Sequence, residues 1–296
     1  MEHSTAGSEQ YQRIIENLRQ LPSLPSVATR LMEVVNSPYS SADDAANLIE
    51  KDPALTSTVL RMANSAFYGM PRSVSSVSSA VVILGFNTIR SIVLSASIMK
   101  AFPGKEKVPR FDRQKFWRHS ILCALGAKLL AHRVTQPLAL DPEGAFCAGI
   151  LHDIGKLIFE QYVSDMFTRA CSYAMSCKKP LVEIEKKVMG VTHAEIGRIL
   201  SDKWALPIDL EQALVYHHTP EAAEQARELV VTVHCADIMA HRVGADIWQG
   251  EVINPLWDET FFVLPIKQND YLECSKELKQ NVDKSIEFLT MIHYAE

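Results

Sequence analysis

Apolar residues recur along this chain at spacings of three and four, the period of an amphipathic helix. The pattern predicts a first helix starting near Tyr11 and further helices over 27–36, 41–50 and 53–63. Ser41 and Asp52 are suitable N-caps for the last two, and Pro53 suits a first helical position. Two short apolar helices should meet at Gly85. The run AVVIL could form a strand by composition, but no hairpin turn or alternating partner lies nearby, so we predict a helix there too.

The segment 103–110, PGKEKVPR, has the composition of a linker, and helical periodicity resumes after it. A loop at 248–266 should precede a closing amphipathic helix at 270–293. The remaining predicted helices cover 112–133, 144–162, 160–178, 180–188, 192–204, 207–217 and 220–243. The fold class is therefore all-α, a multi-helical bundle. The predicted regions are 1–20 (tail and first helix), 21–108 (N-terminal helical half), 109–245 (second helical half) and 246–296 (loop and final helix).

Composition narrows the class of protein. The 296 residues, 47% of them hydrophobic, suffice for a sizeable core. A net charge of −5 without clustered Lys and Arg gives no support to nucleic-acid binding. Six cysteines without a CxxC pair predict reduced, buried thiols. No apolar run reaches the roughly 18 residues that a membrane span needs, so we expect a cytoplasmic protein without membrane contact.

Nine of the ten histidines follow residue 108, and several of them interrupt apolar helical patterns together with aspartates. Burying such groups is costly unless they are paired or ligate a metal. The candidate ligands are His119, His152, Asp153, His193, His217, His218 and Asp237. Imidazole and carboxylate without thiolate favour Fe, Mn, Zn or Co, in a mononuclear or dinuclear site. Gly149 and Gly155 permit close helix approach there, and Lys156 is placed on the helix face of Asp153, where it could contact a phosphate.

The ordered motifs RHS, ILHDIGKL, THAEIG, YHHTP and CADIMA resemble the signature of the HD superfamily of metal-dependent phosphohydrolases. The earlier segments, LPSLPSVATR through MANSAFYG and VSSAVVILGFNTIRSIVL, are similar to the HDOD branch of that superfamily. Together the two regions span about residues 18–243. The resemblance implies an all-helical, HD-domain-like bundle with an N-terminal helical subdomain, and a role in bacterial signal transduction.

The resemblance also implies roles for single residues. His119, His152, Asp153 and Asp237 correspond to the four ligands of the basic HD metal site. His193, His217 and His218 correspond to histidines that build a second metal position in HD-GYP phosphodiesterases, where Lys156 matches a phosphate-contacting lysine. Two departures stand out. TPEAAEQARE follows His218 in place of a GYP-like segment, and Lys115 lies one turn before His119, where some of those enzymes have a further carboxylate ligand.

Each of these assignments has a plainer alternative. His193, His217 and His218 could be hydrogen-bonding neighbours of a mononuclear site, Lys156 could pair with a nearby acid, and Asp237 could pair locally. Asn64 reads as a helix C-cap or backbone hydrogen-bonder. We interpret His132, His234, His241 and His293 as core hydrogen-bonders or surface residues.

The candidate ligands and the family resemblance together suggest two alternative functions. The first is a regulatory HDOD module with a bound metal, acting through signalling protein partners. The alternative is a metal-dependent phosphohydrolase, a phosphatase or phosphodiesterase acting on a nucleotide or another phosphorylated small molecule. In that case Lys156 and Asp153 are the catalytic candidates.

Overall fold

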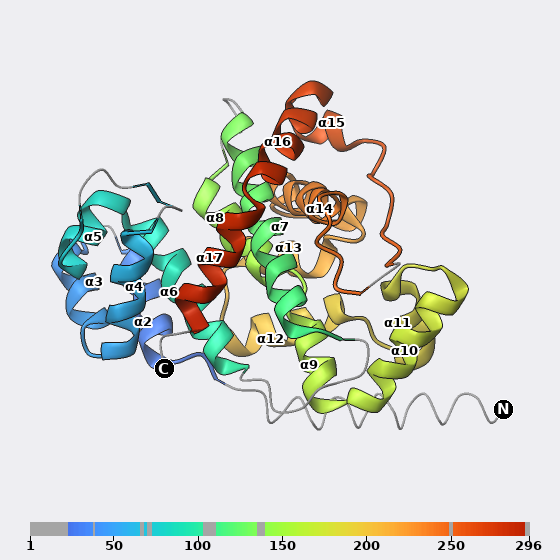
Figure 1. Ribbon diagram of the computed structural model, residues 1–296, viewed down its shortest axis with the longest axis horizontal. Coiled ribbons are helices and arrows are strands. Elements are labelled where there is room, and N and C mark those ends of the chain that lie inside the picture. Colours follow the sequence, from blue (N-terminus) through green and yellow to red (C-terminus); the bar gives the residue numbers. More distant parts are fainter. Residues whose placement is uncertain are drawn as a thin grey trace. The chain divides into compact units, whose positions relative to one another are not determined.

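The computed structural model describes residues 23–37, 39–65, 68–69, 73–102, 111–134, 140–248 and 251–293. Every regular element within these ranges is a helix, and none is a strand (Figure 1). The prediction of an all-α fold is therefore confirmed. The predicted first helix and the predicted boundary near residue 108 lie outside the described residues.

The helices divide into two compact units. The first, here called the N-terminal unit, contains the described residues from 23 to 102 and the final helix. The second, the central unit, contains the described residues from 111 to 279.

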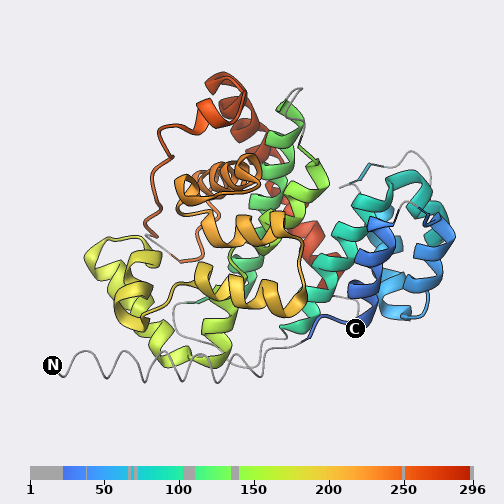
Figure 2. The same ribbon diagram turned by 180° about the vertical axis from the view of Figure 1, so that it is seen from behind.

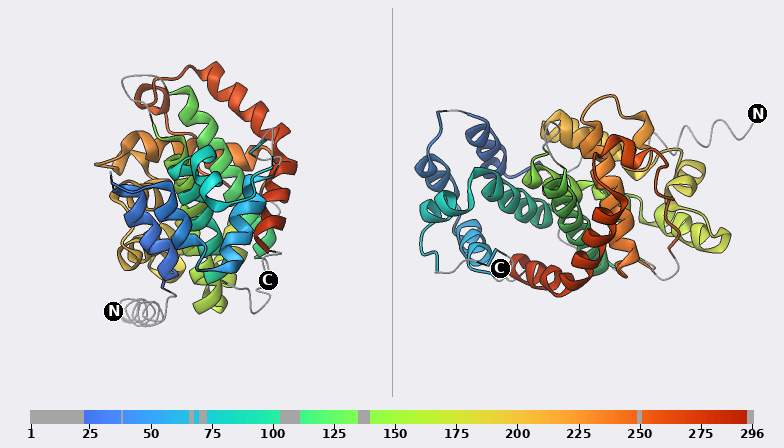
Figure 3. Two further views of the ribbon diagram at one scale, coloured as in Figure 1. Left: turned by 90° about the vertical axis from the view of Figure 1, so that its left-hand side faces the viewer. Right: turned by 90° about the horizontal axis from the view of Figure 1, so that it is seen from above.

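The N-terminal unit is built from helices whose starts are encoded locally. Ser41 forms a capping box with Asp44, and the Asp52 carboxylate accepts hydrogen bonds from two backbone N–H groups of the next helix. Gly85, at φ +83°, lies between two helices as predicted. The helices are α2 (Ser26–Asn36), α3 (Ala42–Ile49), α4 (Pro53–Ala63), α5 (Val77–Leu84), α6 (Phe86–Ala101) and α17 (Val282–His293). Although α17 is far from α4 in sequence, the two pack together, and Arg61 donates to the Met291 carbonyl (Figure 3).

Asn64 is the C-cap of α4, and its side chain forms hydrogen bonds with the chain that follows the helix. Its Nδ2 donates to the carbonyls of Leu60 and Val74, both at 2.8 Å, and its Oδ1 accepts from the Val74 N–H at 2.7 Å. The predicted backbone-bonding role is confirmed. The side-chain amide thus replaces the backbone partners that a helix end lacks.

Replacing Asn64 with alanine should lower the free energy of unfolding by about 1–3 kcal/mol, because it leaves the polar groups of Val74 without these partners. Urea denaturation followed by circular dichroism measures the change. Asn47→Ala is the matched control, since Asn47 is exposed on α3. An equal effect of both substitutions would contradict this role of Asn64.

The central unit is arranged around α7 (Arg113–Arg133), which packs along α8 (Pro142–Leu151) and α14 (Arg227–Arg242) (Figure 1). A Cβ on Gly149 of α8 would lie 2.5 Å from the Ala124 Cα of α7, so only glycine allows this approach. Helices α12 (His193–Trp204) and α13 (Ile208–Tyr216) lie side by side, coloured yellow to orange in Figure 2. The others are α9 (Ile154–Tyr162), α10 (Ser164–Cys177), α11 (Leu181–Met189), the 3₁₀ turn η1 (Pro220–Ala222), α15 (Thr260–Val263) and α16 (Gln268–Gln280).

Three predicted continuous helices are wrong, because each is broken. The predicted helix 144–162 stops at His152 and restarts after Asp153, whose φ of −100° and ψ of 7° leave the helical region. The predicted helix 220–243 is a 3₁₀ turn followed by α14, which begins after Ala226 in a left-handed conformation. The predicted helix 270–293 divides after Gln280, and its two parts belong to different units.

Two further expectations concern cysteines and membranes. All six cysteines are free; Cys177 is half-buried and the other five are buried. Within the described residues no single helix combines the length and the apolar composition of a membrane span. Among the described helices, α5 and α6 meet these criteria when taken together, and that pair is bent by 119°.

Candidate metal centre

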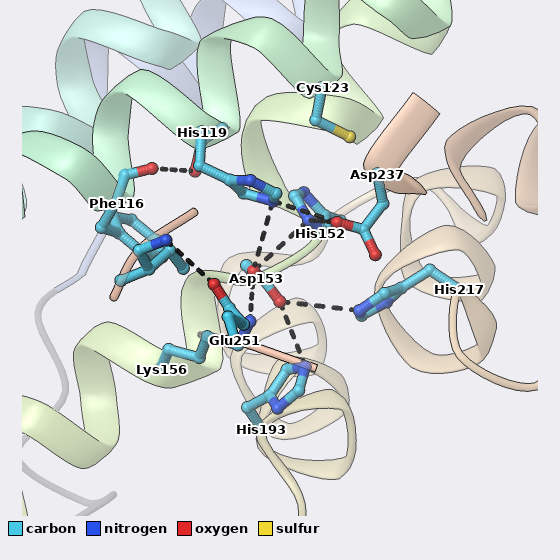
Figure 4. Close-up of polar contacts among 12 residues, drawn as sticks. Phe116, His119, Cys123, His152, Asp153, Lys156, His193, His217, Asp237 and Glu251 are labelled. Atoms are coloured by element: carbon cyan, nitrogen blue, oxygen red, sulfur yellow. Dashed lines mark hydrogen bonds and ion pairs between the residues drawn. The ribbon is translucent and has the colours of Figure 1, made fainter. Parts of the chain in front are cut away.

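Predicted ligands at the ends of four helices lie close together in the central unit. His152 ends α8, Asp153 precedes α9, His193 begins α12 and His217 follows α13. His119 and Asp237 approach from within α7 and α14. Asp153 is an N-cap residue by position, yet its carboxylate makes no capping hydrogen bond and is turned toward the histidines instead (Figure 4). The break between α8 and α9 therefore lets the Asp153 carboxylate face the histidines of the cluster.

Asp153 is the centre of this cluster. Its Oδ1 lies 3.1 Å from His193 Nε2 and 3.6 Å from His217 Nε2. Its Oδ2 lies 3.4 Å from His152 Nε2 and 3.8 Å from His119 Nε2 (Figure 4). The two carboxylate oxygens thus face two separate sets of imidazoles, an arrangement suited to one carboxylate shared between two metal positions.

One set joins Asp153 with His193, His217 and His218, whose candidate ligand atoms all lie within 4.8 Å of one another. The other joins Asp153 with His119 and His152 under the same limit. Asp237 belongs with this second set, since its Oδ1 is 3.0 Å from His119 Nε2 and 3.7 Å from His152 Nε2. All seven predicted ligands are therefore gathered in one cluster.

The imidazole rings are oriented by their backbone neighbours. Nδ1 of His119, His152 and His217 faces the carbonyl of Ala245, Gly149 and Leu214, at 3.1, 2.7 and 2.9 Å. Because a carbonyl only accepts hydrogen bonds, Nδ1 carries the proton in each ring and the Nε2 of a neutral ring is bare.

These bare nitrogens are the strongest sign of a metal. The Nε2 atoms of His119, His152 and His217 and the Oδ1 of Asp153 are buried, and within the described chain none has a hydrogen-bond partner. Buried polar atoms left unsatisfied are rare in folded proteins. Lone pairs of imidazole and carboxylate directed at one another repel unless a cation lies between them. The donor set therefore fits a divalent transition metal.

Electrostatics keep most of the ligands in the forms that bind metals, whereas the charges of neighbouring groups outweigh burial and raise the pKa of His152 and of His193. Burial lowers the pKa of His119 and of His217 to about 4, so both rings are neutral near pH 7. Burial alone would raise the pKa of Asp153, but Lys156 and the surrounding histidines outweigh it and hold that pKa well below the usual range. Asp237 is held low in the same way by its histidine neighbours. Both carboxylates are thus ionised.

Lys156 is buried and its Nζ lies 2.6 Å from Asp153 Oδ2. The attraction of Asp153 outweighs burial and raises the pKa of Lys156, so the ammonium stays charged. The structure thus places Lys156 in the ion pair that was the plainer alternative. Its contact with a phosphate stays a prediction.

The sequence interpretation missed three residues of this site. His241, read as a core or surface histidine, lies with its Nε2 3.4 Å from Asp237 Oδ1, one helical turn along α14. The spacing of four residues from Asp237 was a signal that could have indicated this. Glu251, whose carboxylate is buried 3.7 Å from His241 Nδ1, and Glu185, which binds His193, carried no comparable signal. His234, by contrast, is a core hydrogen-bonder as interpreted, with Nδ1 2.8 Å from the His217 carbonyl.

His241 carries charge into this region. Burial disfavours its charged form, but the carboxylates of Asp237 and Asp246 outweigh burial and raise its pKa to about 10. His241 Nδ1 lies 3.1 Å from Asp246 Oδ1. His241 therefore links the Asp237 edge of the cluster to the segment that follows α14.

A model of the HDOD domain family matches residues 21–220, which is most of the chain. The chain belongs to the HDOD domain family. The matched range includes the N-terminal unit's helices α2–α6 and the site residues from His119 to His218. Asp237, His241 and Glu251 follow it.

Individual relatives agree with this family. An HDOD domain protein of unknown function from Geobacter sulfurreducens is 25% identical, with a TM-score of 0.74 over 98% of this chain and 99% of the other. A proposed phosphohydrolase from Shewanella amazonensis is 26% identical, also with a TM-score of 0.74, over 95% and 98%. An uncharacterised protein of Treponema pallidum is 26% identical over 226 residues, 76% of this chain. The chain spans less than half the length of the curated relatives it matches.

Proposed function

We propose that this HDOD protein is a regulatory module that holds a divalent transition metal in its buried histidine and aspartate cluster and acts through protein partners. The ligand shell would comprise His119, His152, Asp153 and Asp237 at one position, and Asp153 with His193, His217 and His218 at the other. Family membership supports the regulatory part of the proposal, and the bare Nε2 atoms support the metal.

One observation carries the regulatory reading, namely how completely the cluster is enclosed. Six of the seven candidate ligand residues are no more than 6% exposed, and only His218 is half-buried. The side chains of Lys156 and Glu251 next to them are 5% and 4% exposed. Catalytic metal sites keep a position open for water and substrate, whereas structural sites are closed by protein ligands. Enclosure by the chain's own side chains thus favours a metal that stabilises one conformation of the module.

The runner-up function is hydrolysis of a phosphoester. Lys156 is a buried cation beside Asp153, suited to holding a phosphate oxygen, and the Shewanella relative is a proposed phosphohydrolase. A divalent metal in the cluster would supply Lewis-acid polarisation of a phosphoryl group. On this reading the Asp153 carboxylate, 2.6 Å from the ammonium, holds Lys156 in position.

Elemental analysis of the purified full-length chain, combined with a hydrolysis panel, separates the two functions. We expect stoichiometric Fe, Mn, Zn or Co in the wild type, and no turnover of nitrophenyl phosphates, nucleotides or cyclic dinucleotides above the background of His152→Gln. His152→Gln removes a bare buried Nε2 and should lower the metal content. His132→Gln is the control, because His132 is exposed on α7.

Two results would overturn this proposal in different ways. A folded wild type that takes up none of these metals would eliminate the metal site. A turnover rate that persists in His132→Gln and is lost in His152→Gln would replace the regulatory reading with the hydrolase.

A further inference from the structure

Glu185, on α11, is a fully buried carboxylate directed at His193. Its Oε2 accepts hydrogen bonds from both N–H groups of that residue, from the backbone at 2.8 Å and from Nδ1 at 2.6 Å. Its Oε1 has no hydrogen-bond partner within the described chain. Within the described chain, the hydrogen bonds that Glu185 accepts therefore come from His193.

Burying a carboxylate away from water is costly, so this placement needs a reason. Capping of α12 is an insufficient one, because the capping box of Thr192 and Glu195 already serves that helix start. The ring of His193 offers a better reason. Its other nitrogen, Nε2, lies 3.1 Å from Asp153 Oδ1 and 2.9 Å from His218 Nε2.

We infer that Glu185 is a positioning residue for metal binding, which keeps the proton of His193 on Nδ1 and directs Nε2 into the Asp153, His217 and His218 set. The inference rests on the metal site of the proposed function. A carboxylate that accepts from one ring nitrogen fixes the tautomer and raises the basicity of the other nitrogen as a ligand. Nδ1 of His119, His152 and His217 faces a neutral carbonyl, so the carboxylate on Nδ1 of His193 sets this ring apart from those three.

The test compares Glu185→Gln with the wild type by titration of each full-length chain with Zn²⁺ after chelator treatment. Glutamine has nearly the same shape, but it lacks the charge and has a single acceptor oxygen. We expect zinc affinity to fall about 10- to 100-fold, the usual effect of losing such an outer carboxylate. Glu183→Gln is the matched control on the same helix, since Glu183 is exposed and pairs with Lys179. It should leave the affinity unchanged.

A second measurement does not depend on metal. Proton NMR should show a slowly exchanging, far-downfield Nδ1–H resonance for His193, assigned by its loss in His193→Gln. In Glu185→Gln this resonance should move upfield and exchange faster. If Glu185→Gln does not fold, Glu185→Asp replaces it, with the same expected directions, because aspartate withdraws the charge by one carbon.

Unchanged zinc affinity and an unchanged His193 resonance in the folded Glu185 variant would overturn the inference. Failure of the proposed function looks different, because the wild type itself would then bind no zinc while the resonance still responded to Glu185. A loss of thermal stability with both readouts intact would assign Glu185 a purely structural role.

Discussion

Asp153→Asn should abolish metal binding and markedly destabilise the central unit. Asp153 is the one residue shared by both groups of candidate ligands, and its two oxygens face four imidazoles. The loss of affinity should exceed the roughly 10- to 100-fold that outer partners contribute. The substitution also leaves the Lys156 ammonium buried without its closest counter-charge, at a cost of about 3–5 kcal/mol in the free energy of unfolding. Elemental analysis and urea denaturation measure the two effects.

A double substitution separates them. Asp153→Asn with Lys156→Met removes the buried pair together, and replacing both charges by neutral groups of similar volume is often close to neutral. We therefore expect the double variant to regain most of the lost stability while still binding no metal. Recovery of metal binding along with stability would show that Asp153 acts only through Lys156, and would contradict its assignment as a ligand.

The backbone around Asp153 also shows which features of the fold could not be predicted from the sequence alone. Helix starts such as those at Ser41 and Asp52 are decided by contacts within four residues, so local patterns predicted them. The break after His152 has no such local cause, because the Asp153 carboxylate makes no capping hydrogen bond and no proline stands nearby. Its advantage appears only when His119 of α7, His193 of α12 and His217 after α13 approach the Asp153 carboxylate. The composition of the cluster was predictable from motif order, but the backbone geometry that forms it was not.

Glu185 and Glu251 show a different limit. Glu185 lies in the segment LVEIEKKVM, where the charges of Glu183 and Lys186 read as the solvent face of an amphipathic helix. Only the packing of α11 against its neighbours shows that the Glu185 carboxylate points inward. Glu251 lies in a segment after α14 that has no helical periodicity. The sequence therefore gives no sign that Glu251 lies near His241. The place of His241 in the site could have been predicted from the sequence, since it lies one turn from Asp237 on α14.

Gly155→Ala should have the largest effect of any single methyl group in this region. A Cβ at this position would lie 2.0 Å from the backbone oxygen of His193 and 2.8 Å from its carbonyl carbon. Both are backbone atoms, so no side-chain rotation relieves the overlap, and α9 and α12 must separate. We expect a loss of about 3 kcal/mol or more in the free energy of unfolding, at the upper end of overpacking effects. Because α9 follows Asp153 and α12 begins with His193, metal affinity should fall too.

Gly197→Ala provides the comparison for this prediction, measured by urea denaturation and zinc titration. Gly197 lies inside α12, and a Cβ there would be 3.4 Å from the Leu214 Cβ, an ordinary contact. Alanine also has the higher helix propensity by roughly 1 kcal/mol. The Gly197 variant should therefore keep both its stability and its zinc affinity. If Gly155→Ala behaved in the same way, α9 and α12 could not be as close as the structure places them, and the 3.1 Å approach of His193 to Asp153 would have to be abandoned with it.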